Sequence, residues 1–253
     1  MAVTASLGRW QLSRAAEKQA LQSMLDARAR LPALDATAFL GAAGTETAAT
    51  AQTAAAEAPS PSPPAHEWLH RAVTLQGRWL GAHTVFLDNR QMQGRPGFFV
   101  LTPFQVEGRS DVVVVQRGWV PRNFQDRTQL PPVATPEGLV RLQGRVAAAP
   151  SRLYEFQGGG GAEGSSRIRQ NLDLYAFRAE TGLALASLTV LQTDSADSAG
   201  DGLQRDWPVV GAGVDKHYGY AFQWFGLCGL IALLYVWFQI VRRFIRPRSQ
   251  PAP

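Results

Sequence analysis

The chain has 253 residues and a formal net charge of +5. Its single cysteine excludes an internal disulfide, a Cys-x-x-Cys redox centre and a covalently attached c-type haem within one chain. The positive charge does not indicate nucleic-acid binding, because several of the excess arginines cluster after the last apolar segment and no lysine-rich run or basic helix occurs elsewhere. The length suits one domain of ordinary size with an anchor.

The sequence predicts helical structure in the first part of the chain. Residues 1–8 are uncharged and too short to span a membrane, and we interpret them as the remnant of a first membrane segment that begins upstream. From Leu7 to Arg28 apolar residues recur among charged ones at helical spacing, and the next proline is Pro32. We therefore expect an amphipathic helical region over residues 9–40.

A low-complexity stretch follows over residues 41–65. It consists mainly of alanine, threonine, proline and serine and contains the run Pro59-Ser60-Pro61-Ser62-Pro63-Pro64. Almost no side chain in it is large enough to bury apolar area on folding. We expect this stretch to be a disordered insert.

From residue 66 to residue 214 the hydrophobic period changes to two. β-Branched and aromatic runs occupy residues 73–79, 84–90, 97–104, 112–120, 139–146 and 185–191, separated by glycine, proline and asparagine. This pattern is typical of an antiparallel sheet or small barrel, with one helical turn over residues 173–181. The predicted fold class is mainly β within an α+β chain: a barrel-like outer domain, an amphipathic N-terminal helix and a C-terminal transmembrane helix.

Residues 218–241 contain no charged side chain, which is enough to cross about 30 Å of hydrocarbon at about 1.5 Å per residue. Aromatic residues lie near both ends of this segment, where amphipathic rings favour the headgroup zone. Arginines follow in the basic tail, residues 242–253, which we expect in the cytoplasm. In a bacterial chain the domain at residues 66–214 then lies in the periplasm.

Three glycines, Gly219, Gly226 and Gly229, thin one side of this predicted helix. They leave room for another helix or a flat ligand to approach closely. The alternative is that transmembrane helices are rich in glycine without a specific partner. The sequence does not decide between these interpretations.

No catalytic pattern stands out, so we do not expect an enzyme. The histidines are His66, His70, His83 and His217, without a His-Glu-x-x-His pattern or a cluster at metal-ligand spacing. His217 is the most suggestive, because it begins the membrane segment beside aromatic residues, where an imidazole can ligate haem iron. The alternative is a polar residue that anchors the helix at the interface.

Several stretches together resemble the Surfeit locus protein 1 family of cytochrome c oxidase assembly factors. They are Leu7-Gly8-Arg9-Trp10-Gln11, Asn89-Arg90 with Gly94-Arg95-Pro96-Gly97-Phe98, Arg117-Gly118-Trp119-Val120-Pro121, Gln170-Asn171-Leu172-Asp173, and His217 with Tyr220-Ala221-Phe222-Gln223-Trp224-Phe225. Two departures from the family pattern occur. The first transmembrane helix, which precedes the Leu-Gly-x-Trp-Gln motif in such proteins, is not in this sequence, and the insert at residues 41–65 is longer than expected.

The resemblance implies a membrane chaperone of the respiratory chain, in the bacterial inner (cell) membrane, that helps to insert haem a into subunit I of an aa3-type oxidase. The implied partners are this subunit, the haem a biosynthesis machinery and the lipid bilayer. The resemblance also implies that His217 contributes to haem a binding through the haem iron. The expected cofactor-binding residues are His217, Tyr220, Gln223, Trp224, Arg117 and Arg90.

Arginine forks match carboxylates, so Arg90, Arg117 and Arg9 are candidates to pair with haem propionates. For Arg117 the alternative is structural, namely a strand that ends on the packed Trp119. Two other functions remain open. One is a haem-free scaffold that stabilises an oxidase assembly intermediate, and the other is a membrane-anchored periplasmic hydrolase.

Overall fold

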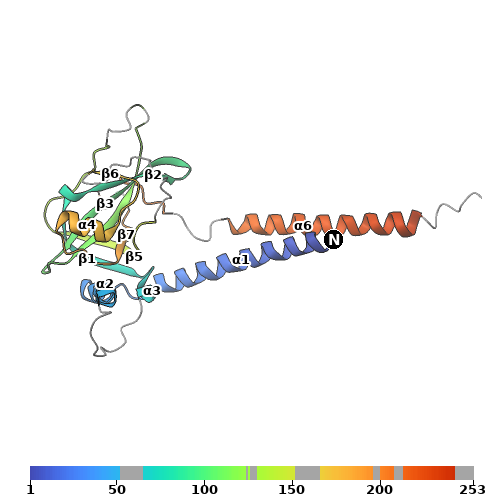
Figure 1. The fold of residues 1–253 in the computed structure, drawn as a ribbon, viewed down its shortest axis with the longest axis horizontal. Helices are drawn as coiled ribbons and strands as arrows, with labels where there is room; N and C mark the ends of the chain where they lie inside the picture. Colours follow the sequence, from blue (N-terminus) through green and yellow to red (C-terminus); the bar gives the residue numbers. More distant parts are fainter. Residues whose placement is uncertain are drawn as a thin grey trace, which may run out of the picture. The chain divides into compact units, whose positions relative to one another are not determined.

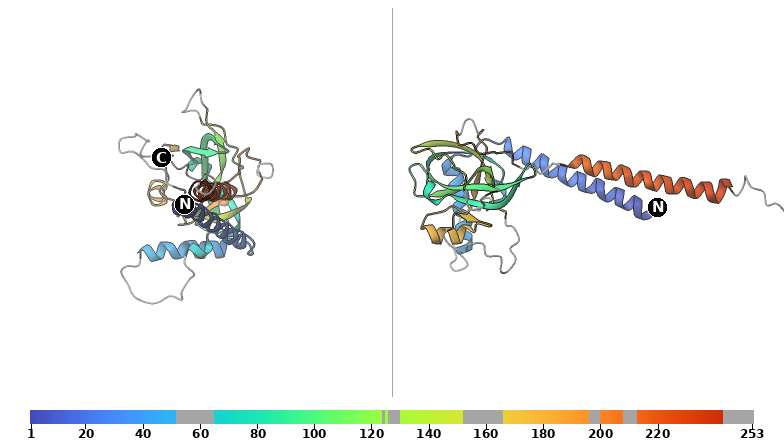
Figure 2. Two further views of the ribbon diagram at one scale, coloured as in Figure 1. Left: turned by 90° about the vertical axis from the view of Figure 1, so that its right-hand side faces the viewer. Right: turned by 90° about the horizontal axis from the view of Figure 1, so that it is seen from above.

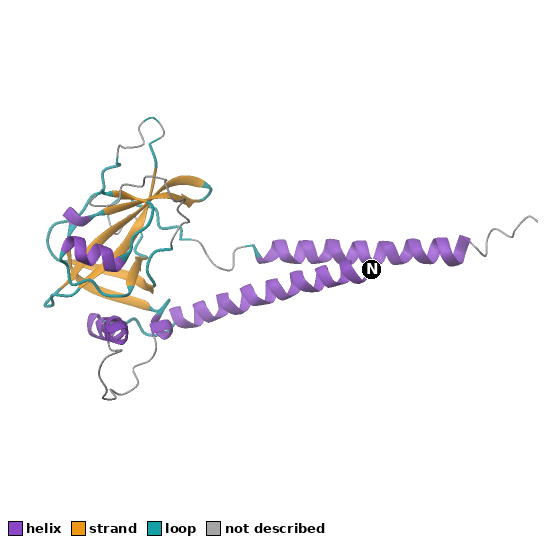
Figure 3. Ribbon diagram, viewed as in Figure 1, coloured by secondary structure: helices purple, strands orange, loops and turns teal. Residues whose placement is uncertain are grey.

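A computed structural model of the chain describes residues 1–51, 65–123, 125, 130–151, 166–195, 200–207 and 213–242, except the side chains of residues 45–51, 65, 66, 240 and 241 (Figures 1 and 3). The chain divides into two compact units. One contains Met1–Asp26 and Pro208–Pro253, and the other contains Ala27–Trp207. We refer to them as the helix unit and the barrel unit.

The described strands of the barrel unit form one seven-stranded sheet in the order β1-β5-β7-β4-β3-β2-β6. The strands are β1 (Ala72–Trp79), β2 (Val85–Met92), β3 (Arg95–Val106), β4 (Val112–Pro121), β5 (Val140–Ala147), β6 (Ile168–Arg169) and β7 (Thr189–Gln192). An additional antiparallel pairing of β1 with β3 closes five of these strands into a barrel. The predicted barrel-like fold is confirmed, with the addition that β4 pairs with β7 and β2 with β6 in parallel.

The core of the barrel follows from the period of two in its strands. Alternate residues of neighbouring strands, such as Val73 and Leu75 on β1 or Val113 and Val115 on β4, are buried in one cluster. At Gly77 a Cβ atom would lie 2.0 Å from the carbonyl oxygen of Gln105 on β3. The barrel therefore closes where β1 carries no side chain.

The predicted helical turn at residues 173–181 is α4 (Leu174–Thr181). Asp173 is its N-cap, and the carboxylate accepts hydrogen bonds from the backbone N–H groups of Tyr175 and Ala176. Phe177 on α4 is buried in a second apolar cluster with side chains of β2, β3 and β4. The Gln170-Asn171-Leu172-Asp173 stretch thus sets where this helix begins.

The prediction of a disordered insert over residues 41–65 is wrong for residues 41–51, which belong to helix α2 (Ala36–Ala51). Alanine is the strongest helix former, and the side chains of Phe39, Leu40 and Ala43 are buried in the barrel core. Residues 52–64 lie outside the described residues. The chain resumes in the short helices α3 (Ala65–Trp68) and η1 (Gly81–His83).

The helix unit contains most of α1 (Ala2–Ala29), together with α6 (Val214–Val236) and its π-helical continuation η2 (Trp237–Val241). Residues 2–29 form one helix, so the predicted boundary between residues 8 and 9 lies inside α1. The burial of α1 does not follow the expected amphipathic pattern. Its apolar residues Leu12, Leu21 and Met24 are each 40% exposed. Residues 214–239 form a helix that is long and apolar enough to cross a membrane. That a first membrane segment begins upstream stays a prediction.

Candidate functional site

The helix unit is a pair of antiparallel helices, and α1 and α6 lie side by side in Figures 1 and 2. Small residues of α1 are buried at helical spacing, namely Thr4, Gly8 and Ala15, and Ala221 is buried on α6. Four contacts give the direction of the pair: Gln19 with Tyr218, Gln11 with His217, Gly8 with Phe225 and Met1 with Cys228. The seam between the helices is therefore built from small and polar side chains.

Gly8 has a specific part in this seam. A Cβ atom at Gly8 would lie 2.8 Å from Cζ of Phe225 on α6, well inside van der Waals contact. The glycine of the Leu7-Gly8-Arg9-Trp10-Gln11 stretch therefore allows the two helices to approach closely. Sequence reasoning missed this role, although the glycine was visible in the motif.

The glycines that the sequence singled out have a different environment. A Cβ atom built at Gly219, Gly226 or Gly229 would meet no atom within 4 Å among the described residues. The side of α6 that these glycines thin is thus not the side that packs on α1. Its use by another helix or a flat ligand stays a prediction.

His217 lies in the first turn of α6 and is partly buried against α1. Its Nδ1 atom is 2.7 Å from Oε1 of Gln11. A carbonyl oxygen can only accept, so Nδ1 carries the proton in this pair, and a neutral imidazole then has its lone pair on Nε2. A histidine held in this way through Nδ1 is prepared to bind a metal through Nε2.

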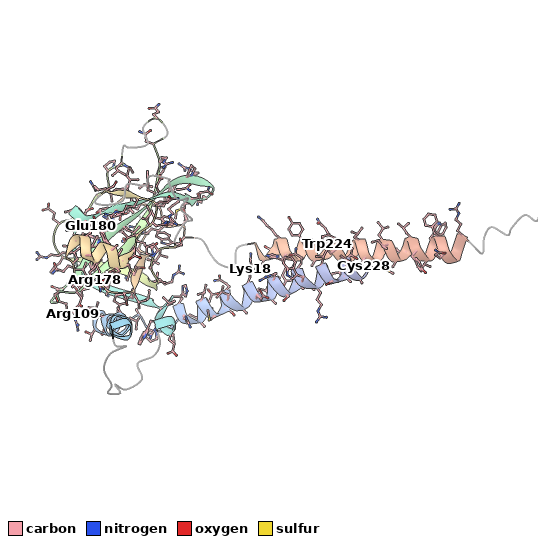
Figure 4. The ribbon with its side chains drawn as sticks, viewed as in Figure 1. Lys18, Arg109, Arg178, Glu180, Trp224 and Cys228 are labelled. Carbon is pink, nitrogen blue, oxygen red and sulfur yellow. The ribbon has the colours of Figure 1, made fainter. Side chains whose placement is uncertain are left out.

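Two aromatic side chains that follow His217 on α6 are exposed; Tyr220 lies on the same side of the helix as His217, and Phe222 lies on a different side. Tyr220 is 52% exposed and Phe222 80% exposed, whereas Trp224, marked in Figure 4, is half-buried. Trp224 lies two helical turns after His217 and therefore on the same side of α6. Gln223 is exposed next to it. This end of α6 thus combines one imidazole with flat aromatic side chains.

Among the residues that the structure describes, no group of three or more His, Cys, Asp or Glu side chains could hold a metal ion. Arg9 of the helix unit is exposed on α1.

Arg117 belongs to the barrel unit, where its side chain is 1% exposed. Its guanidinium donates to Oγ1 of Thr135 at 2.8 Å, to the carbonyl oxygen of Ala134 at 2.7 Å and to Oδ2 of Asp201 at 3.2 Å, and it lies 4.6 Å from the centre of the Trp79 ring. Burial lowers the pKa of Arg117, while the charge and hydrogen bond of Asp201 oppose that shift. The guanidinium is thus held by the fold on several sides.

Arg205 also donates to Oδ2 of Asp201, so two buried arginines share one carboxylate. A pocket of about 290 Å³ next to this cluster contains a second carboxylate, that of Asp194. Asp194 Oδ2 accepts hydrogen bonds from the backbone of Gln143 and the side chain of Gln192. Both carboxylates are engaged in holding the fold together, which does not favour the hydrolase interpretation.

Arg90 is also buried in the barrel unit, and burial lowers its pKa. It donates to the carbonyl oxygens of Ser151 at 2.8 Å and Gln170 at 3.0 Å, while its own carbonyl accepts from Nε1 of the fully buried Trp119 at 3.0 Å. The structure thus joins the Asn89-Arg90, Arg117-Pro121 and Gln170-Asp173 stretches in one hydrogen-bonded region.

The structural interpretation of Arg117-Gly118-Trp119-Val120-Pro121 is confirmed, because β4 ends at Pro121 with Trp119 packed in the interior. The pairing of Arg90 and Arg117 with propionates stays a prediction. Of the six expected site residues, the structure places His217, Tyr220, Gln223 and Trp224 on α6, and the two arginines on β2 and β4.

Comparisons with known proteins agree with the resemblance seen in the sequence. A model of the SURF1 family matches residues 1–229. A segment of 54 residues is 33% identical to the cytochrome oxidase assembly protein SHY1 of Saccharomyces cerevisiae. This segment makes up 21% of the chain and spans 14% of the yeast protein.

Proposed function

The chain belongs to the SURF1 family, and we propose that it is a non-catalytic assembly factor of cytochrome oxidase that binds haem a and assists its insertion into subunit I of an aa3-type enzyme. The role printed in the name of the yeast relative supports the assembly part of this proposal. The observation that carries the haem part is His217, held through Nδ1 at the start of an apolar helix.

Haem a is large and apolar, so a protein that transfers it should hold it next to the membrane and release it again. A single neutral nitrogen ligand suits this need, because it binds the iron without a covalent attachment. The rings of Tyr220 and Trp224, three and seven residues after His217 and on the same side of α6, supply flat surface for such a cargo. When bound, haem a would supply a redox-active iron centre, and the Nε2 atom of His217 would hold that iron.

The membrane placement is part of the same proposal. The helix at residues 214–239 anchors the chain, and the arginines in the tail after it favour a cytoplasmic C-terminus. The barrel unit then lies in the periplasm of a bacterial cell, and His217 begins the helix at the outer interface. We propose oxidase subunit I and the haem a biosynthesis machinery as partners in that membrane.

The test is the haem content of the full chain, purified in detergent from cells that make haem a. We expect a Soret band for the natural sequence and a loss of at least about tenfold in haem content for His217→Ala. The matched control is His83→Ala, which removes a histidine of the barrel unit and should leave the haem content unchanged.

A His217→Ala protein with full haem content and an unchanged visible spectrum would contradict the ligand role. If the natural sequence carries no Soret band at all, the proposal fails in favour of the haem-free scaffold. Co-purification of subunit I with His217→Ala, together with loss of haem, would separate the two roles and support haem binding.

A further inference from the structure

Gln11 reaches His217 because of the residues around it on α1. Gly8 lies three residues before Gln11, and Ala15 lies four residues after it. Both are buried in the seam with α6. Residues at these spacings share one face of a helix, so Gln11 points toward α6 as well. The close approach at Gly8 brings the two backbones near enough for the amide to span the seam.

The direction of the hydrogen bond decides which nitrogen of His217 is available. With Oε1 of Gln11 facing Nδ1 at 2.7 Å, the imidazole proton is on Nδ1 and the lone pair is on Nε2. If the amide NH₂ faced Nδ1 instead, the proton would lie on Nε2 and block metal binding. With its amide oxygen toward Nδ1, Gln11 thus favours the tautomer that binds iron.

The amide also affects how strongly the imidazole nitrogen donates electron density to a bound metal. A carboxylate partner makes a ligating histidine more basic and its metal bond tighter, whereas an amide carbonyl is a neutral, weaker acceptor. For a histidine that must release its cargo, a neutral partner limits the strength of the iron bond.

A second contact of the same kind exists nearby. The hydroxyl of Tyr218 donates to Oε1 of Gln19 at 3.2 Å, again between α6 and α1. Gln19 therefore holds the residue next to His217 without touching the imidazole. It provides an internal control for any effect that comes only from joining the helices.

We propose that Gln11 is a positioning residue for His217, which fixes the tautomer that presents Nε2 to haem iron and gives the imidazole a neutral hydrogen-bond acceptor. This inference rests on the proposed haem ligation by His217. It concerns a residue of the Leu7-Gly8-Arg9-Trp10-Gln11 stretch and therefore assigns that stretch a part in the haem site.

The experiment uses the full chain, purified in detergent after co-expression with the haem a pathway, and four variants: Gln11→Met, Gln11→Glu, Gln19→Met and His217→Ala. Methionine keeps the length and helix propensity of glutamine but not its hydrogen bond. Two quantities are measured, the rate of haem transfer to apomyoglobin and the midpoint potential of the bound haem. Far-UV circular dichroism checks that each variant keeps its helices.

We expect Gln11→Met to release haem about 10 to 100 times faster. Gln11→Glu should release it more slowly and lower the midpoint potential, by about 59 mV if the ferric form gains tenfold in affinity over the ferrous form. Gln19→Met should match the natural sequence in both measurements.

Two results would overturn the positioning role. One is that both Gln11 variants match the natural sequence while His217→Ala loses haem, which leaves the proposed function intact. The other has two parts: Gln19→Met releases haem as fast as Gln11→Met, and Gln11→Glu does not shift the midpoint potential. In that case Gln11 would only join the two helices. If His217→Ala retains its haem, the proposed function itself fails.

Discussion

The two units of the molecule differ in how their polar side chains are buried and paired. In the barrel unit the guanidinium groups of Arg90 and Arg117 are buried, and each has several hydrogen-bond acceptors from the surrounding fold. In the helix unit His217 is only partly buried, and among the described residues its Nδ1 atom pairs with Gln11. A polar group that the fold surrounds with partners contributes to stability, whereas a group held on one side keeps capacity for a ligand.

The difference has a physical cause in the two architectures. A closed barrel has an interior, where an unpaired charge would be strongly destabilising, so each buried arginine requires acceptors. A pair of helices has only a narrow seam, and much of α6 remains exposed apolar surface, including Phe222 and Leu233. Such surface is suited to lipid, to another helix or to an apolar ligand. The four predictions below test this comparison, starting with the largest expected effect.

Asp201→Ala should cause the largest loss of stability. It leaves the side chains of Arg117 and Arg205 buried together without their shared carboxylate, and we expect about 3–5 kcal/mol less free energy of unfolding. The measurement is denaturant unfolding of the full chain in detergent, followed by tryptophan fluorescence. The control is Asp206→Ala, an exposed carboxylate that accepts one hydrogen bond from Gln93, with an expected change under about 0.5 kcal/mol. Equal effects would show that the arginines do not depend on Asp201.

Gly8→Leu should loosen the helix pair by about 1–3 kcal/mol, because the new side chain overlaps the ring of Phe225. Alanine is too small for this test, since an aromatic ring can turn away from one methyl group. The measurement is the thermal midpoint of the helical circular dichroism signal. Gly219→Leu is the control, because no atom of the described residues lies within 4 Å of a Cβ atom built at that position. A pair of variants with equal midpoints would argue against a close seam at Gly8.

Asp173→Ala should destabilise the barrel unit by about 1 kcal/mol, because α4 loses the carboxylate that accepts from its first N–H groups. Asp173→Asn is the matched variant, since asparagine caps a helix about as well as aspartate. Denaturant unfolding of both variants measures the difference. If the alanine and asparagine variants unfold alike, the cap does not contribute.

His70→Asn should change the dependence of stability on pH, with the smallest effect of the four, under about 1 kcal/mol. Burial, followed by the charges of Arg145 and Arg28, lowers the pKa of His70 below its ordinary value of 6.5. The folded chain then binds this proton less readily than the unfolded chain, so stability is lost as pH falls below about 6.5.

Asparagine does not titrate, and it tolerates the positive φ of 70° at this position. Between pH 7 and pH 5 the variant should therefore lose less free energy of unfolding than the natural sequence. The measurement is denaturant unfolding of both proteins at the two pH values. If the free energy of unfolding changes with pH in the same way in both proteins, His70 is not a cause of the acid sensitivity.

Local patterns were enough to predict the elements themselves. The period of two predicted the strands of the barrel, and the uncharged run at residues 218–241 predicted a helix long enough to cross a membrane. His217 was selected by its place at the start of that run. The prediction failed at residues 41–51, where low complexity indicated disorder but a helix of alanines is held by the burial of Phe39, Leu40 and Ala43.

The sequence by itself determined the fold class, the apolar helix and the candidate histidine, because hydrophobic period and charge are properties of neighbouring residues. Only the tertiary structure decided which atoms surround the polar groups. Gln11 and His217 are 206 positions apart, and Arg117 and Asp201 are 84 positions apart. No local pattern encodes such pairs, since they form only when packing brings distant segments together. That packing made Arg117 a buried structural cation and left His217 held through a single nitrogen.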